Sequence, residues 1–196
     1  MKINRISPDL YEIEDFVTVE QQVEVLEFFK SLDEQAWWTT PEGHEQHGFF
    51  YGKQYHDKRP DVFNQITSNV RNLFSTSLYI GDIGLQRYKI DEAMQEHRDY
   101  WLYDEDYHIR YGIAIYYNDD YEGGEISYPE LNIVHKPKAR SLLMHGGNIL
   151  HGTLPVTSDD TRFFSTAFVR GSVESPVTLD PELFAEVELH DGSSYT

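Results

Sequence analysis

The sequence predicts a mainly β fold, a double-stranded β-helix or jelly roll with flanking N-terminal helices, in a single domain. Two observations predict it. Residues 1–84 contain two stretches with apolar side chains at helical spacing, and residues 85–170 consist of short apolar or aromatic runs separated by Gly, Pro, Asn and Asp. A chain of 196 residues is long enough to bury one core. We therefore expect one domain, 1–196, with helical support over 1–84, a jelly-roll core over 85–170 and a C-terminal extension over 171–196.

The first predicted helix begins near Thr18, because Thr18 and Gln21 have capping-box spacing. The second follows Pro60, a residue that suits the first turn of a helix. The apolar positions at helical intervals are Val25, Phe28, Phe29 and Leu32 in the first and Phe63, Ile66, Val70 and Leu73 in the second. Each set forms one stripe, so both helices are expected to cover the core.

Seven short strands are expected after the helices, at Leu85–Ile90, Arg110–Tyr117, Glu125–Tyr128, Ile133–His135, Ser141–Met144, Ile149–His151 and Phe163–Arg170. A roll of such strands has an open-mouthed interior lined by alternate residues, so rigid walls can carry a site. The segment from Ser175 to Thr196 allows a short helix, a lid or a contact surface.

Composition excludes several classes of function. There is no cysteine, hence no disulfide and no thiolate site. The formal net charge is −18 and no basic patch is visible, which argues against nucleic-acid and membrane-surface binding. No apolar run approaches the roughly 20 residues that cross a bilayer, and the first ten residues lack a signal-peptide core. We expect a cytoplasmic protein.

His97 and Asp99 are the sharpest candidates for chemistry. Residues i and i+2 of an extended chain point the same way, so an imidazole and a carboxylate there can bind one ion. His151, on a predicted strand, offers a third ligand. Two histidines and one carboxylate on one face of an octahedron are typical of non-haem iron(II) oxygenases. His145 is the alternative third ligand.

Arg162 begins the aromatic run that ends at Phe168. A cation entering an apolar strand is costly unless it binds an anion. Strand alternation places Arg162, Phe164, Thr166 and Phe168 on one face. If that face is the cavity, the guanidinium can hold a ligand carboxylate in a bidentate pair. The alternative is a strand-end arginine with its head group in water.

Several motifs occur in series between Leu85 and Arg170. They are Tyr88 ahead of His97-Arg98-Asp99, the strand Arg110–Asn118, Gly123-Gly124-Glu125, Lys136-Pro137, the run His151–Val156, and Arg162. In this order they resemble the prolyl 4-hydroxylase-like branch of the Fe(II)/2-oxoglutarate-dependent dioxygenases. Two positions depart from that pattern: Arg140 stands in a stretch where relatives usually have a glycine, and His145 stands near an aromatic position.

The resemblance implies a set of roles. His97, Asp99 and His151 would bind Fe(2+), Arg162 would bind the distal carboxylate of 2-oxoglutarate, and Tyr88 and Tyr116 would line the cosubstrate pocket. It implies O2 as oxidant and ascorbate as a candidate reductant. The reaction would hydroxylate a C–H bond, by the family's example that of a prolyl residue in a peptide or protein, with release of succinate and CO2.

A peptide, a protein or a small molecule is the expected substrate. The aromatic segments from Trp37 to Tyr51 and at Tyr100-Trp101 suggest a groove for a proline-rich peptide, or else core packing. The acidic runs at Asp104–Asp106 and Asp119-Asp120 are interpreted as solvated loops. The histidines at 44, 47, 56, 108, 135 and 190 are interpreted as surface or capping residues.

Two other functions remain open on sequence grounds. A zinc hydrolase on a cupin-like roll would use the same three ligands to activate water, but it leaves Arg162 without a task. A non-catalytic sensor module would bind metal or 2-oxoglutarate without turnover.

Overall fold

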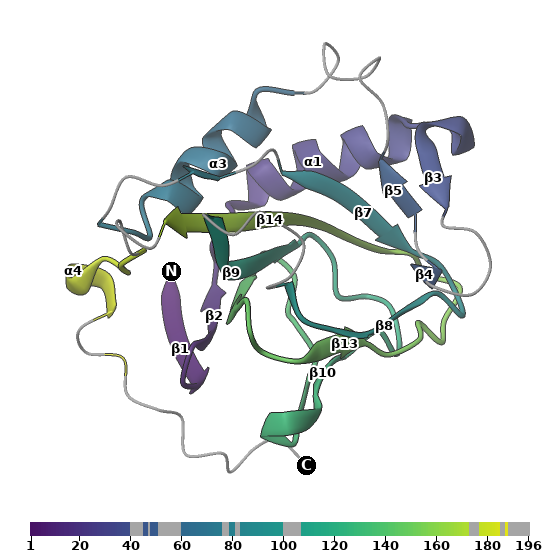
Figure 1. Cartoon of the computed structure of the whole chain (residues 1–196). Helices are drawn as coiled ribbons and strands as arrows, with labels where there is room; N and C mark the ends of the chain where they lie inside the picture. The colour runs from purple at the N-terminus through teal and green to yellow at the C-terminus, as the bar shows by residue number, and fades with distance from the viewer. Residues whose placement is uncertain are drawn as a thin grey trace.

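The structure is a computed structural model, which describes residues 1–39, 45–46, 48–50, 60–75, 79–80, 83–99, 107–172, 177–184 and 187. Two antiparallel sheets face each other as a roll, and two helices cover the outer face of the larger sheet (Figure 1). The predicted jelly roll with flanking helices is therefore confirmed.

The larger sheet has the strand order β1-β2-β12-β9-β14-β7-β5-β3, with β6 paired to β14. Its strands are Lys2–Ser7 (β1), Leu10–Glu14 (β2), Trp37–Thr39 (β3), Gly48–Phe50 (β5), Tyr79–Ile80 (β6), Gly84–Tyr88 (β7), Tyr107–Tyr116 (β9), Leu142–Gly146 (β12) and Arg162–Ser172 (β14). β9 and β14 pair along almost their whole length. Their side chains alternate between the inside of the roll and the helix layer.

The smaller sheet has the order β11-β10-β13-β8-β4. Its strands are Glu45–Gln46 (β4), Ala93–His97 (β8), Ile126–Tyr128 (β10), Ile133–His135 (β11) and His151–Thr153 (β13). In the β8–β13 pair, His151 lies directly opposite His97. The register of this sheet thus brings together two residues that are far apart in the sequence.

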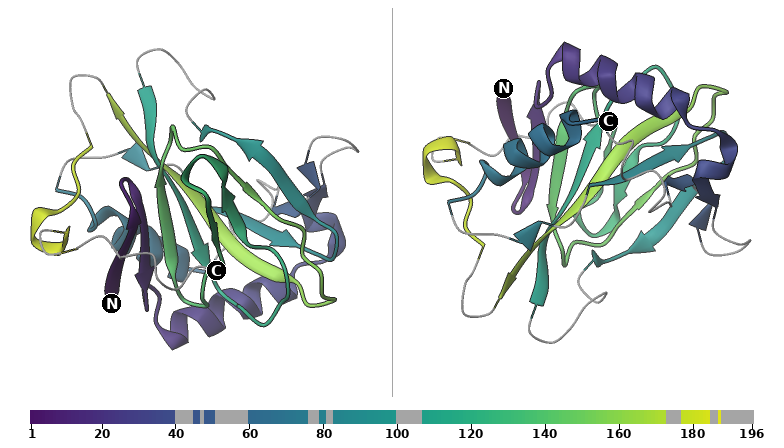
Figure 2. Two further views of the ribbon diagram at one scale, coloured as in Figure 1. Left: turned by 90° about the horizontal axis from the view of Figure 1, so that it is seen from below. Right: turned by 90° about the horizontal axis from the view of Figure 1, so that it is seen from above.

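The two helices of the outer layer are α1, Val19–Ser31, and α3, Val62–Arg71. Both lie across the strands of the larger sheet, as Figure 2 shows. The predicted capping box is present: the Gln21 backbone N–H donates to Thr18 Oγ1 at 3.2 Å, and the Thr18 N–H donates to Gln21 Oε1 at 3.0 Å. The stripes meet where the rings of Phe28 and Phe63 pack edge to face, with centroids 5.8 Å apart.

The expectation of helical support over 1–84 is wrong for residues 2–14, which form the β1–β2 hairpin on the edge of β12, and for the short strands β3, β4, β5 and β6. Four consecutive residues of β2, from Leu10 to Ile13, are buried, because the strand lies between β1 and β12 and packs on both faces. A strand buried on both faces lacks the alternation that marks a half-exposed one. β8 was missed for the opposite reason, since its residues are only partly buried or exposed.

All seven predicted strands exist; β11 has the predicted bounds, and the other six have shifted ends. The largest correction concerns β13, which begins at His151 where the prediction ended. The turn at Gly146 continues further than expected, because the Ile149 N–H donates to the Gly146 carbonyl at 2.9 Å. His151 is therefore the first residue of its strand rather than the last, and it still faces β8.

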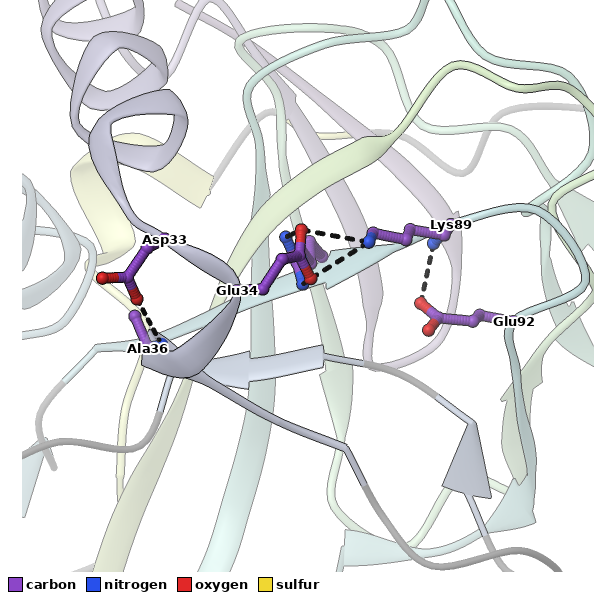
Figure 3. Close-up of polar contacts among 6 residues, drawn as sticks. Asp33, Glu34, Ala36, Lys89 and Glu92 are labelled. Atoms are coloured by element: carbon purple, nitrogen blue, oxygen red, sulfur yellow. Dashed lines mark hydrogen bonds and ion pairs between the residues drawn. The ribbon is translucent and has the colours of Figure 1, made fainter.

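An ion-pair network ties the helix layer to β7 (Figure 3). It starts at the short 3₁₀ helix η1, Glu34–Ala36, which Asp33 caps through the Ala36 N–H at 3.0 Å. Glu34 accepts from both terminal nitrogens of Arg87, at 3.1 and 2.5 Å, and from Lys89 at 3.2 Å. Because Arg87 points outward, its neighbours Gln86 and Tyr88 point into the roll.

The C-terminal segment contains one short helix, α4, Pro181–Phe184, among its described residues. The segment is tied to the core by a bridge between Phe74 and Leu179 and by an edge contact of the Phe184 and Tyr11 rings at 5.4 Å. Of the three open interpretations, a short helix is what forms. In the part of the chain that the structure describes, no helix has the length and apolar character to cross a membrane.

Candidate active site

A cavity of about 530 Å³ opens between the two sheets. The inward residues of β14 line it in the predicted alternation: Arg162, Phe164, Thr166 and Phe168. Gly112, Ala114 and Tyr116 do so from β9, and Tyr88 from β7. The predicted metal ligands line the same cavity, His97 and His151 from the smaller sheet and Asp99 from the turn after β8, so one cavity contains both halves of the predicted site.

His97, Asp99 and His151 meet at this cavity. One potential ligand atom from each lies within 4.8 Å of the others, and among the described residues this is the one such cluster. The two imidazole rings are 4.4 Å apart, and His97 Nε2 is 3.5 Å from Asp99 Oδ1. Asp99 and His151 are buried, whereas His97 is partly exposed. Such a cluster, with one exposed side, suits a metal that keeps open positions.

Backbone carbonyls orient both ring systems. His97 Nδ1 lies 2.9 Å from the Gln95 carbonyl, and His151 Nδ1 lies 3.1 Å from the Ile149 carbonyl. A carbonyl can only accept, so each Nδ1 carries the proton and donates. The lone pair then resides on Nε2, the atom through which each ring can bind a metal.

The protonation state of the cluster also suits a cation. Burial, together with the neighbouring His145, lowers the pKa of the His151 imidazole to about 3, so the ring is neutral. Burial by itself raises the pKa of the Asp99 carboxyl, but the neighbouring imidazoles, His145 foremost, outweigh it and hold that pKa well below its usual range. A neutral imidazole and an ionised carboxylate are the forms that ligate.

His145 lies behind Asp99 and donates to it. His145 Nε2 is 3.1 Å from Asp99 Oδ2, and its ring centroid is 3.9 Å from that of His151. Its other nitrogen, Nδ1, is 3.4 Å from the Tyr128 hydroxyl. Among the described residues His145 does not belong to the cluster whose ligand atoms lie mutually within 4.8 Å, which favours His151 as the third ligand.

Arg162 is fully buried, with 0% of its surface exposed. Its Nη2 donates to the Tyr116 hydroxyl at 3.3 Å, while Nε and Nη1 have no hydrogen-bond partner among the described residues. Aromatic rings surround the guanidinium, with centroids 4.3 Å away at Phe164, 4.9 Å at Tyr88 and 5.1 Å at Tyr116. The predicted strand-end arginine with its head in water is therefore excluded.

A buried guanidinium without a carboxylate partner is costly, and aromatic faces offset only part of that cost. No acidic side chain of the described residues forms an ion pair with Arg162. Among the described residues Nε and Nη1 thus keep their N–H groups for an anion, and Nη2, which donates to Tyr116, carries a second N–H group. The residues present thus fit a small anion at this end of the cavity and a divalent metal at the other.

No family model matches this sequence, and no curated protein is similar to it in sequence. Solved structures are similar in fold. A viral collagen prolyl hydroxylase from Paramecium Bursaria Chlorella virus-1, in complex with 2-oxoglutarate, has a TM-score of 0.61 at 17% identity, over 83% of this chain and 96% of that one. The chain has the fold of a prolyl hydroxylase-like 2-oxoglutarate oxygenase.

Two further structures extend this likeness. A prolyl hydroxylase from Trichoplax adhaerens, in complex with a hypoxia-inducible-factor peptide, has a TM-score of 0.64 at 13% identity, over 92% of this chain and 88% of that one. HygX from Streptomyces hygroscopicus, with nickel and 2-oxoglutarate bound, has a TM-score of 0.58 at 13% identity, over 84% and 83%. At these identities the oxygenase fold is shared, and the chemistry must be argued from the residues.

Several residues of the site were not predicted. Tyr128 and Tyr121 are buried beside the cavity, and the Tyr121 ring centroid is 6.0 Å from the guanidinium carbon of Arg162. Alternation with Ile126 on a predicted strand points Tyr128 inward, but Tyr121 lies in a loop without such a signal.

His135 was expected to be a surface or capping residue, and this was wrong. It is 3% exposed and its Nε2 lies 3.2 Å from Oε1 of Glu12, which is equally buried. The sequence around His135 could not predict this contact, because Glu12 lies on β2 of the larger sheet and His135 on β11 of the smaller one. The predictions for histidines 44, 47, 56 and 190 lie outside the described residues, as do those for Asp104–Asp106 and Tyr100-Trp101.

Trp37 belongs to the core rather than to a peptide groove. It is buried, and its ring stacks on Phe29 with centroids 5.7 Å apart. The side chains of Trp38, Phe49 and Phe50 and all of Tyr51 lie outside the described part of the structure. The groove therefore stays a prediction for those residues.

Proposed function

We propose that this protein is an Fe(II)- and 2-oxoglutarate-dependent dioxygenase. The observation that carries the proposal is the pairing, in one cavity, of a His-Asp-His cluster with a fully buried arginine whose Nε and Nη1 have no hydrogen-bond partner in the described part of the chain. A metal cluster alone would suit zinc hydrolysis equally well. The buried arginine has a task in the oxygenase, because 2-oxoglutarate carries a carboxylate at each end, and it has none in the hydrolase.

His97, Asp99 and His151 would hold the iron, and Arg162 would take the distal carboxylate of 2-oxoglutarate through the N–H groups that do not donate to Tyr116. Tyr116 keeps Arg162 in place by accepting from Nη2. Tyr88 and Phe164 pack on the guanidinium and exclude water, which strengthens its attraction for a carboxylate. When bound, iron with 2-oxoglutarate and O2 supplies the oxidising chemistry that yields succinate, CO2 and a hydroxylated product, and ascorbate is the proposed reductant.

The substrate proposed is a prolyl residue in a peptide or protein. It is supported by the fold shared with the viral collagen prolyl hydroxylase and with the Trichoplax enzyme bound to a peptide. The protein's own net charge of −18 favours a basic or neutral peptide over an acidic one.

Anaerobic titration with iron(II) and 2-oxoglutarate tests the site. We expect a weak visible charge-transfer band in the wild type that disappears in His97→Ala and in Asp99→Ala. Tight zinc binding without any band in the wild type would favour the hydrolase. A matched control is His108→Ala, which removes a histidine of β9 that does not line the cavity.

Succinate release tests the substrate. In the presence of proline-containing peptides we expect release to rise, and mass spectrometry should show the peptide gaining one oxygen atom. The same peptide with alanine in place of proline is the control. If free amino acids or nucleotides stimulate succinate release and no peptide does, the proposal of a prolyl substrate is wrong but the proposal of an oxygenase stands.

A further inference from the structure

His145 contacts Asp99, a candidate metal ligand, without itself belonging to the ligand cluster found among the described residues. It lies on β12, near a position where the prolyl 4-hydroxylase-like dioxygenases that this sequence resembles have an aromatic residue. Its ring is buried, and it contacts Asp99 on one side and Tyr128 on the other. A polar ring at this depth needs both contacts, since a buried polar atom without a partner is costly.

The tautomer of His145 is opposite to that of the two other histidines. A carboxylate oxygen accepts, so His145 Nε2 carries the proton and donates to Asp99 Oδ2 at 3.1 Å. Its Nδ1 is then the acceptor for the Tyr128 hydroxyl at 3.4 Å. Its Nε2 therefore has no lone pair to give a metal, in contrast to Nε2 of His97 and His151.

The neighbouring backbone leaves room for this contact. A Cβ atom at Gly112 would lie 2.2 Å from Asp99 Oδ2 and 2.6 Å from His145 Nε2, closer than any side chain tolerates. Only glycine allows the carboxylate and the imidazole to meet here. The contact is thus built by three strands or loops: β9 through Gly112, β12 through His145, and the turn after β8 through Asp99.

We propose that His145 is a positioning residue that occupies Oδ2 of Asp99, so that Oδ1, the oxygen facing His97, is the one presented to the metal. The proposal rests on the proposed function, because it assigns His145 a task toward the same metal. The imidazoles of His97 and His151 are each oriented by the backbone carbonyl two residues earlier in the chain, and Asp99 receives the equivalent support from His145.

Three variants distinguish the effect of the His145–Asp99 hydrogen bond from that of the His145–Tyr128 hydrogen bond. His145→Gln places an amide nitrogen near the former Nε2 and keeps the donor to Asp99. His145→Asn is one methylene shorter, so it keeps a polar group near Tyr128 but does not reach Asp99. His145→Phe keeps the aromatic packing and loses both bonds. Circular dichroism of the metal-free proteins verifies that each is folded before its metal affinity is compared.

The experiment is titration with cobalt(II), followed by its visible absorption, without 2-oxoglutarate and without turnover. We expect the dissociation constant to rise roughly 10- to 100-fold in His145→Phe and His145→Asn, with a changed spectrum, and by less than about 3-fold in His145→Gln. His97→Ala should abolish the spectrum.

Each other result overturns the proposal in a recognisable way. Wild-type affinity in the Phe and Asn variants would show that the contact has no role. A loss in His145→Gln as severe as in His97→Ala would make His145 a ligand. A wild-type protein that binds no cobalt, or binds it equally well after His97→Ala and Asp99→Ala, would remove the proposed function together with this role. Only the last result touches the proposed function.

Discussion

Arg162 and Tyr116 form a buried hydrogen bond of 3.3 Å that uses one terminal nitrogen of the guanidinium, Nη2, and among the described residues Nε and Nη1 have no hydrogen-bond partner. The hydroxyl takes only one of the two N–H groups of Nη2, so the other guanidinium N–H groups are left for a second partner. This division of donors explains how a cation can be fixed in an apolar pocket and still bind a second group.

Arg162→Ala should weaken 2-oxoglutarate binding much more than metal binding, because the arginine lies apart from the His-Asp-His cluster. We expect a loss of at least about 100-fold in 2-oxoglutarate affinity, the scale of a charge-assisted bidentate pair. Calorimetry with manganese(II) and then 2-oxoglutarate measures both. Tyr116→Phe, which keeps the ring, should show a loss below about 10-fold. Equal losses of metal and 2-oxoglutarate affinity would contradict the assigned role.

Gly112→Ala should weaken metal binding, because the new methyl group would lie 2.2 Å from Asp99 Oδ2 and force the carboxylate away. The expected loss in cobalt(II) affinity is about 10-fold or more. Gly84→Ala is the matched control, since a Cβ there meets its nearest atom, Thr166 Oγ1, at 3.4 Å. Comparable affinity in both alanine variants would be evidence against a crowded contact at Asp99.

Glu34→Gln should destabilise the protein at neutral pH by about 0.5 kcal/mol, a small amount because 71% of the Glu34 side chain is exposed. Hydrogen bonds from Arg87 lower the pKa of Glu34 to about 2 from an ordinary value of 4.5. A lowered pKa stabilises the fold above the unfolded value, and this contribution disappears as the pH falls from about 4.5 to about 2.

Urea unfolding at pH 7 and near pH 2 tests the Glu34 prediction, with the exposed α1 residue Glu24 changed to Gln as the control. The difference between Glu34→Gln and wild type should be present at pH 7 and absent near pH 2. A difference that is the same at both pH values would show that the ion pair is not its cause.

His135→Leu should cost about 3 kcal/mol of unfolding free energy, because it leaves the buried Glu12 carboxylate without this imidazole 3.2 Å away. The double change Glu12→Leu with His135→Leu removes both polar groups and should recover most of the loss. Chemical denaturation of the wild type, the single variant and the double variant measures their free energies of unfolding. If the double variant is the least stable of the three proteins, the Glu12–His135 pair stabilises the fold by more than compensating one buried charge.

Much of the site could be predicted because its residues alternate along strands. Arg162, Phe164, Thr166 and Phe168 share one face of β14, and period-2 alternation alone placed them together. The His97–Asp99 spacing is equally local. The meeting of His97 with His151 required the register of β8 and β13, which the sequence shows only through its likeness to the prolyl 4-hydroxylase-like pattern.

The rest could not be predicted because it depends on contacts between the sheets or within doubly buried strands. β2 carries no alternation signal, since both of its faces are covered, and its Glu12 meets His135 from the opposite sheet. The tautomer of His145 follows from Asp99 and Tyr128, which come from two other segments of the chain. Pairings of this kind are fixed by the closed roll and not by local pattern.

Oxidative turnover of 2-oxoglutarate tests the central claim most directly. With iron(II), O2 and ascorbate, the wild type should convert 2-oxoglutarate to succinate and CO2 in equal amounts, and Asp99→Ala and Arg162→Ala should lose this activity while staying folded. If the wild type forms the iron and 2-oxoglutarate charge-transfer band but releases no succinate with any peptide or small-molecule substrate, the protein is a sensor and not an oxygenase.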